Sequence, residues 1–179
     1  YSVDISADGE YITAVDRSGK KVYLFDKDSN TPLWSFQGSH NGHSVSISAD
    51  GEYIVAGYDG SGHSKVYLFG KASNTPIWSN TVGGDVVRTV AISSDGEYII
   101  AGNNNGKVYL FDKDSSTPIW TYSTSDAIRS VAISSDGEYI TAGNEGGKVF
   151  LFDKDSSTPL WSYTTGDWVT SVAISADGK

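Results

Sequence analysis

The chain of 179 residues contains no cysteine and no methionine. It therefore has no disulfide, no thiolate metal ligand and no thiol nucleophile. No apolar run approaches the length of a membrane span, so we expect no transmembrane segment. The formal net charge of −9 argues against binding nucleic acid through its phosphates, but it is neutral about protein or carbohydrate partners.

The residues that are present form a tandem repeat. Corresponding segments begin at Ser2, Ser44, Thr89, Ser130 and Ser171, so the successive periods are 42, 45, 41 and 41 residues. All four prolines occupy one position of the repeat, and a tryptophan follows each of them by two residues. These four tryptophans are Trp34, Trp78, Trp120 and Trp161. A fixed period of this length is typical of a radial or stacked repeat architecture.

Each repeat divides into four short predicted strands. In the fourth repeat these are about Arg129–Ser134, Tyr139–Gly143, Lys148–Phe152 and Leu160–Tyr163. Ser135-Asp136-Gly137 supplies the first turn, because aspartate can bond its own backbone and glycine adopts positive φ freely. Glycine, serine, threonine, tyrosine, isoleucine and valine are abundant while helix formers are scarce, so the sequence predicts an all-β chain.

The third strand of each repeat indicates how the sheets pack. Val149-Phe150-Leu151-Phe152 is apolar at consecutive positions, as are the cognate strands Lys21–Phe25, Lys65–Phe69 and Lys107–Phe111. Both faces of each sheet are then covered, as happens when sheets stack around an axis. We therefore predict a β-propeller of four-stranded antiparallel blades, with four complete repeats and the first strand of a fifth. The expected blades are approximately 2–43, 44–88, 89–129 and 130–170, with a partial blade at 171–179.

Two segments resemble the WD-repeat propeller pattern: Val90–Asp112 (VAISSDGEYIIAGNNNGKVYLFD) and Val131–Asp153 (VAISSDGEYITAGNEGGKVFLFD). The end of the repeat resembles a second family. In Asp112–Trp120 and Asp153–Trp161 an aspartate precedes a tryptophan by eight residues, as in the tryptophan-docking motif of propellers of the pyrroloquinoline-quinone type. The resemblance covers all four complete repeats and implies a propeller fold.

The chain also departs from both patterns. Only Gly42-His43 matches the Gly-His pair of WD blades, and phenylalanines (Phe25, Phe111 and Phe152) replace their tryptophan. The Thr-Gly of the docking motif is missing, and Gly70 replaces its aspartate in the second repeat. Dehydrogenases among the quinoproteins use vicinal cysteines and a calcium-ligating acidic cluster. Because cysteine is absent, we expect neither an active quinone enzyme nor a bound cofactor.

Two connections of the repeat vary between copies and should open on one face of the disk. One set is Asp16–Lys20, Tyr58–Ser64, Asn103–Gly106 and Asn144–Gly147, and the other is Gln37–His43, Thr81–Arg88, Ser123–Arg129 and Thr164–Thr170. Recognition usually resides in loops on a rigid scaffold, so we predict that this variable-loop face is the contact surface. Its candidate residues are Arg17, His40, His43, Tyr58, His63, Arg88, Arg129, Glu145 and Trp168. For Trp168 two interpretations stay open, an exposed indole at this face and packing between blades.

Several other patterns have structural as well as functional interpretations. The three histidines could approach one another and hold a metal, but solvated loop histidines are the default. Asp26–Asn30, Asp112–Ser116 and Asp153–Ser157 imitate the start of a calcium loop, yet Asx turns explain them better. Asp85/Arg88 and Asp126/Arg129 predict local ion pairs. Asp4, which replaces a small residue near the axis, is interpreted as a hydrated carboxylate facing the channel, with a cation or ligand contact as alternatives.

The sequence favours a non-catalytic interaction module, with a quinoprotein-like enzyme or cofactor carrier as the alternative. A third hypothesis is an excised or engineered array without a selected binding site. We favour a portion of a longer propeller, with a homodimer completing an eight-blade ring as the runner-up. Either way, the strand containing Val172–Ile174 is expected to pair. An acidic, cysteine-free, Ser/Thr-rich surface favours an extracytoplasmic location.

Overall fold

The computed structural model describes residues 1–84 and 86–178, and it confirms an all-β fold of four blades. The first blade contains β1 (Ser2–Ile5), β2 (Tyr11–Val15), β3 (Lys21–Asp26) and β4 (Trp34–Gln37). The second contains β5 (Gly42–Ile47), β6 (Tyr53–Tyr58), β7 (Lys65–Gly70) and β8 (Pro76–Thr81). The third contains β9 (Val87–Ile92), β10 (Tyr98–Asn103), β11 (Lys107–Asp112) and β12 (Trp120–Ser123). The fourth contains β13 (Ile128–Ile133), β14 (Tyr139–Asn144), β15 (Lys148–Asp153) and β16 (Trp161–Thr164).

Every blade is an antiparallel sheet whose strands follow chain order from the inside outward. In the fourth blade the observed strand bounds differ from the predicted ones by about one residue, within the usual uncertainty of strand ends. None of the described residues lies in a helix, so none of them belongs to a helix that could cross a membrane.

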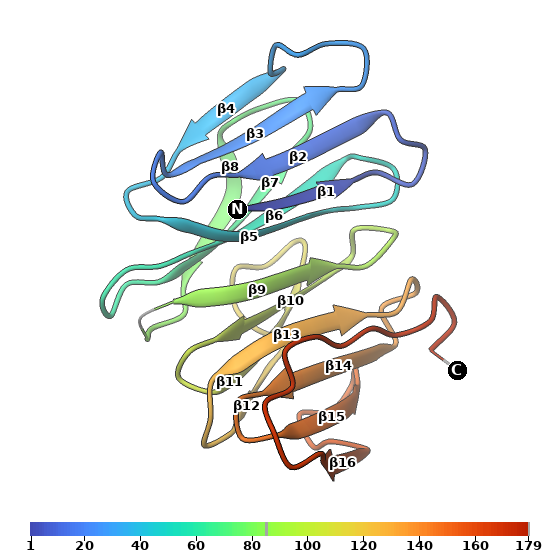
Figure 1. Cartoon of the computed structure of the whole chain (residues 1–179). Helices are drawn as coiled ribbons and strands as arrows, with labels where there is room; N and C mark the ends of the chain where they lie inside the picture. The colour runs from blue at the N-terminus through green and yellow to red at the C-terminus, as the bar shows by residue number, and fades with distance from the viewer. Residues whose placement is uncertain (85, 179) are drawn as a thin grey trace.

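The blades stack in chain order, with the first and the fourth at opposite ends (Figure 1). The inner strands β1, β5, β9 and β13 lie beside one another in that order. Three separate hydrophobic clusters fill the three spaces between consecutive blades. Each blade therefore depends on its neighbours for burial, as in other repeat architectures.

Tryptophan forms the same contact at each of these three interfaces. The indole of Trp120 lies 5.3 Å from the ring of Phe152 in the next blade, and its N–H donates to the Lys154 carbonyl at 2.7 Å. Trp34 and Trp78 make the same ring contacts at 5.5 and 5.4 Å. Their N–H groups also donate to the cognate lysine carbonyls, each at 2.7 Å. Each of these tryptophans thus packs its ring against the next blade while its N–H has a hydrogen-bond acceptor there.

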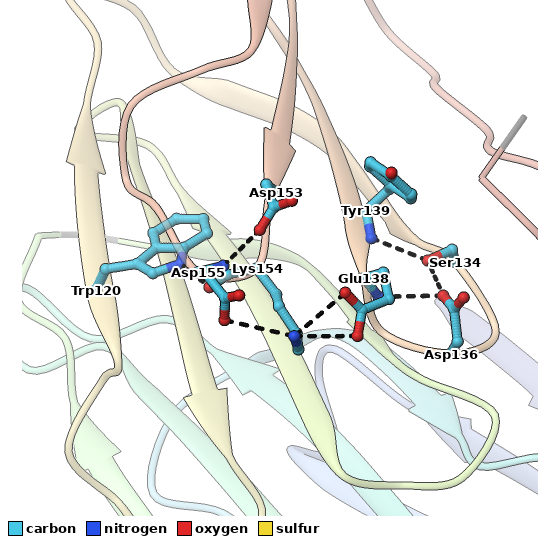
Figure 2. A network of polar contacts seen from close by, with 8 residues as sticks. All are labelled: Trp120, Ser134, Asp136, Glu138, Tyr139, Asp153, Lys154 and Asp155. Atoms are coloured by element: carbon cyan, nitrogen blue, oxygen red, sulfur yellow. Dashed lines mark hydrogen bonds and ion pairs between the residues drawn. The ribbon is translucent and has the colours of Figure 1, made fainter.

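The turns between the first and second strands, which carry Asp-Gly in every repeat, and those between the third and fourth strands lie on the face opposite the variable loops. Their own side chains hold them, as Figure 2 shows for the fourth blade. Ser134 Oγ donates to Asp136 Oδ1 at 2.6 Å and accepts from the Tyr139 N–H at 3.0 Å. In the calcium-like segment, the N–H of Asp155 donates to Asp153 Oδ1 at 2.9 Å, which is the expected Asx turn. The Lys154 ammonium lies 3.0 Å from a carboxylate oxygen of Glu138. Its hydrogen bonds to Glu138 and Asp155 raise the pKa of Lys154 to about 12.

The segment after the fourth blade occupies the inner-strand position of a fifth blade. The N–H of Val172 donates to Ser130 Oγ at 3.1 Å, just as Val131 does to Thr89 Oγ1 at 3.3 Å. A backbone bond of 2.9 Å from Ser135 to Ala176 repeats the links between earlier blades. However, none of the described residues beyond Thr164 forms a strand, so the prediction that this segment pairs was wrong. It has a neighbour inside the stack but no second strand on its other side.

Asp4 binds the adjacent blade. Its Oδ2 accepts hydrogen bonds from Ser46 Oγ at 2.9 Å and from the Ile47 N–H at 3.0 Å. The sequence-based interpretation of Asp4 as a hydrated channel group is therefore incomplete, because one carboxylate oxygen fixes β1 to β5.

Candidate binding face

The variable loops all open on one side of the stack, toward the left of Figure 1. This follows from the antiparallel order, because the start of each first strand and the end of each second strand meet at the same edge. In each blade a residue at the start of the first strand, or directly before it, contacts a residue one or two positions past the end of the second strand. We call these eight residues the inner rim: Tyr1, Arg17, His43, Asp59, Arg88, Asn104, Arg129 and Glu145.

The first two pairs of the inner rim contact each other. The guanidinium of Arg17 lies 5.6 Å from the ring centroid of Tyr1, and the Tyr1 ring meets His43 edge-on at 5.4 Å. His43 Nε2 is 3.3 Å from Asp59 Oδ2. The rim therefore continues from the first blade into the second without a break.

His43 is only 6% exposed, and this burial determines its protonation. Desolvation lowers the pKa of His43, although the hydrogen bond with Asp59 opposes the shift. Burial also acts on Asp59 by raising its pKa, but hydrogen bonds from His43 and from Asn41 at 2.9 Å outweigh this and lower it. The pair is thus a neutral imidazole beside a carboxylate.

The third and fourth pairs bring two arginines to the same edge. Arg88 donates through Nε to Asn104 Oδ1, and Arg129 forms an ion pair with Glu145 at 2.5 Å. Burial lowers the pKa of Arg88, and the nearby positive charge of Arg129 adds to this effect. Arg17 is the remaining arginine of the sequence, so all three arginines belong to the inner rim of a chain that is acidic overall.

Trp168 extends the rim beyond the fourth blade. It is 57% exposed, which decides between the two alternatives that the sequence left open, and the Arg129 guanidinium lies 5.0 Å from its ring centroid. A cation placed over an indole at this distance is attracted to the face of the ring. Arg129 is therefore held between Glu145 and Trp168 while its side chain stays partly accessible.

Three other predicted residues lie outside the rim. Tyr58 is 2% exposed and packs edge-on against Tyr67 at 5.3 Å, so it belongs to the core and not to a contact surface. His40 and His63 are exposed. His40 Nδ1 lies 2.9 Å from Ser39 Oγ, and His63 Nδ1 lies 3.0 Å from the Ser61 carbonyl. In residues 1–84 and 86–178, no group of three or more histidine and acidic side chains is arranged to hold a metal ion.

The predicted ion pair between Asp126 and Arg129 is replaced by other contacts. Arg129 pairs with Glu145 and not with Asp126, which instead accepts a hydrogen bond from Ser125. Asp85 lies outside the described residues. The ladder between β13 and β14 explains the difference, since it aligns the start of β13 with Asn144 at the end of β14.

Three residues of the inner rim, Tyr1, Asp59 and Asn104, were not among the candidates predicted from sequence. A signal for them was present in the repeat. Tyr1, His43, Arg88 and Arg129 each directly precede a Ser/Thr-Val pair, and Arg17, Asp59, Asn104 and Glu145 share a second register. Aligning these two registers across the first turn would have shown the four pairs.

Comparison with known proteins places the chain in a family. No curated protein matches it. The family model described as Outer membrane protein assembly factor BamB matches residues 12–176, which run from the second residue of β2 through β16 and most of the segment after it. Because this match covers most of the sequence and the structure shows the same repeated blades, the chain belongs to the β-propeller family of pyrroloquinoline-quinone-type repeats represented by that assembly factor.

Proposed function

We propose that this chain is a non-catalytic interaction module that binds an acidic segment of a partner protein across the inner rim and Trp168. The observation that supports this most is the gathering of all three arginines on one edge of a protein with net charge −9. Arginine, tyrosine and tryptophan are also the residue types that contribute most to binding energy at protein interfaces.

The pairs within the rim orient these groups for contact. Arg129 is fixed by Glu145 on one side and by the Trp168 ring on the other. Such a guanidinium can donate two parallel hydrogen bonds to a carboxylate of the partner, a bidentate geometry that lysine does not provide. The exposed Trp168 face adds apolar area beside this charge.

The family supports a role in protein contact, because its description names an assembly factor for outer membrane proteins. This description bears only on the class of partner, which we propose is a protein. Carbohydrate is the alternative ligand, since an exposed indole can also stack on a sugar ring.

A displayed library of random peptides, probed in parallel with a glycan array, tests the proposal. We expect enrichment of peptides that contain aspartate or glutamate next to an apolar residue, with binding that weakens as salt is raised. Trp168→Ala and Arg129→Ala should each reduce affinity for the enriched peptides about tenfold or more.

Lys113→Ala is the matched control, because Lys113 is a cation paired with Glu97 on the opposite face. It should leave peptide binding unchanged. Binding to glycans alone would replace the proposed partner class with carbohydrate. Peptide binding that survives both rim variants would show that the rim is not the site.

A further inference from the structure

The two ends of the stack carry the two halves of the interface that forms three times inside the chain. Trp161 occupies the position of Trp120, yet it is 50% exposed where Trp120 is 9% exposed. Within the described residues, the Trp161 indole has no phenylalanine ring beside it and no carbonyl to receive its N–H. The fourth blade therefore carries the tryptophan half of the interface, but within the described residues no blade packs against it.

The first blade presents the receiving half. Val3 is 72% exposed and Ile5 is also exposed, whereas their counterparts Val131 and Ile133 in the fourth blade pack against the third. On the same face of the first blade, Phe25 is half-buried while its counterpart Phe152 is fully buried beneath Trp120. An apolar face of this kind is unusual for a surface that remains in water.

A cleft beside Trp161 shows what shape of occupant is needed. It has a volume of about 340 Å³ and lies between Leu151 and Trp161 on one side and Val172 and Ile174 on the other. At the preceding interface the equivalent space is filled by the second and third strands of the next blade, through Ile140, Ala142, Phe150 and Phe152. In the first blade the same positions hold Ile12, Ala14, Tyr23 and Phe25.

We propose that copies of this chain associate head to tail, with the exposed face of the first blade of one copy packed on the Trp161 cleft of another. In this arrangement the Trp161 ring stacks on Phe25 of the second copy, and its N–H donates to the Lys27 carbonyl there. Both contacts continue the series that Trp34, Trp78 and Trp120 make internally. Two copies joined at both ends form the smallest closed ring that uses all four end faces.

The segment Ser171–Gly178 decides how the junction forms, because it repeats Ser2–Gly9 at every position except one. Asp4 stands where the later segment has Ala173. Only β1 can therefore make the bonds from Ser46 Oγ and Ile47 N–H, and only β1 has a ladder with β2. At a junction between copies, β1 of the second copy takes the inner position and Ser171–Gly178 is displaced.

Sedimentation equilibrium of the full chain over a range of concentrations up to about 100 μM tests the proposal. The expected result is a reversible increase from the mass of one copy, 19.1 kDa, toward twice that mass. Val3→Glu and Trp161→Glu should each weaken association about tenfold or more, because each buries a carboxylate in the apolar junction.

Leu160→Glu is the matched control. Leu160 is as exposed as Trp161, but its counterparts Leu33, Ile77 and Ile119 are also exposed in blades that have a following neighbour. This position faces outward whether or not a blade follows, so the variant should associate normally. A single-copy mass at every concentration, or association unaffected by both end-face variants, would overturn the proposal and leave these faces to a different protein.

The double variant Val172→Asp with Ile174→Asp tests the displacement step in the chain of 179 residues. Both residues hold the segment against the fourth blade at the cleft. If β1 supplies the inner strand, loosening the segment should tighten association by severalfold. Weaker association would show that Ser171–Gly178 itself enters the second copy, and the proposed junction would be wrong.

Discussion

The same six residues, KVYLFD, form β3 in the first blade and β11 in the third, and their surroundings differ. In β11 the four central residues Val108–Phe111 are all buried. In β3 only Val22 and Leu24 are buried, while Tyr23 and Phe25 remain half-exposed. Position in the stack therefore determines burial here, since a blade at the end has a neighbour on one side only.

The fourth blade shows the opposite half of this effect. In β15, Phe150 and Phe152 are buried against the third blade, whereas Val149 and Leu151 face the cleft and are only partly buried. The first and fourth blades are thus half-covered on complementary faces. This contrast between inner and end blades leads to the following predictions.

The largest difference should appear between the tryptophans of the third and fourth blades. Trp120→Ala removes a buried ring and a hydrogen bond to the Lys154 carbonyl, so it should lower the free energy of unfolding by about 3–5 kcal/mol. Trp161→Ala should cost no more than about 1 kcal/mol in dilute solution, because half of the ring is already in water. Urea denaturation of both variants measures the contrast. Equal losses would show that the two ends of the stack are covered.

A smaller effect is expected at the inner-strand position that distinguishes β1 from Ser171–Gly178. Asp4→Ala removes the acceptor for Ser46 Oγ and the Ile47 N–H, so the free energy of unfolding should fall by about 1–3 kcal/mol. Ala173→Asp is the counterpart at the other end, where the described residues provide no further inner strand to donate to the new carboxylate. It should change stability by less than about 0.5 kcal/mol. A neutral Asp4→Ala variant would remove the reason for preferring β1 at a junction.

The smallest effect concerns the pH dependence that His43 contributes at the boundary of the first two blades. Because burial lowers the pKa of His43, the unfolded chain binds this proton more tightly than the folded chain. The free energy of unfolding therefore contains a contribution from neutral, buried His43, which is fully present above the ordinary histidine pKa of about 6.5. This contribution is lost as the pH falls below that value. Unfolding of wild type and His43→Gln between pH 7 and pH 5 measures this contribution. The variant should show the shallower slope, and identical slopes would contradict the assignment.

Much of the fold could be predicted because each repeat encodes its own blade. The consecutive apolar residues of β11 and the turn at Ser135-Asp136-Gly137 depend on local chemistry, and both were confirmed. The outcome at Val172–Ile174 could not be predicted in this way. Strand formation there needs a second strand to pair with, and the sequence of the segment is almost the same as that of β1.

The candidate site was only partly predictable for a similar reason. Arg17 contacts Tyr1 at the inner rim and Arg129 contacts Trp168 there, while the binding role predicted for these residues stays a prediction. The variable loops did not distinguish the exposed Trp168 from the buried Tyr58, because burial of Tyr58 depends on Phe36 and Tyr67, which lie on different strands. Partner choice, as for Arg129 and Glu145, is determined by strand register and not by spacing along the chain.

Amide hydrogen exchange in β3 and β11 tests most directly whether stack position controls local stability. The two strands share one sequence, so their intrinsic exchange rates match and any difference in protection reflects their surroundings. At concentrations where the chain has the mass of one copy, the amides of β11 should exchange more slowly than those of β3. Equal protection of the two strands would contradict the account.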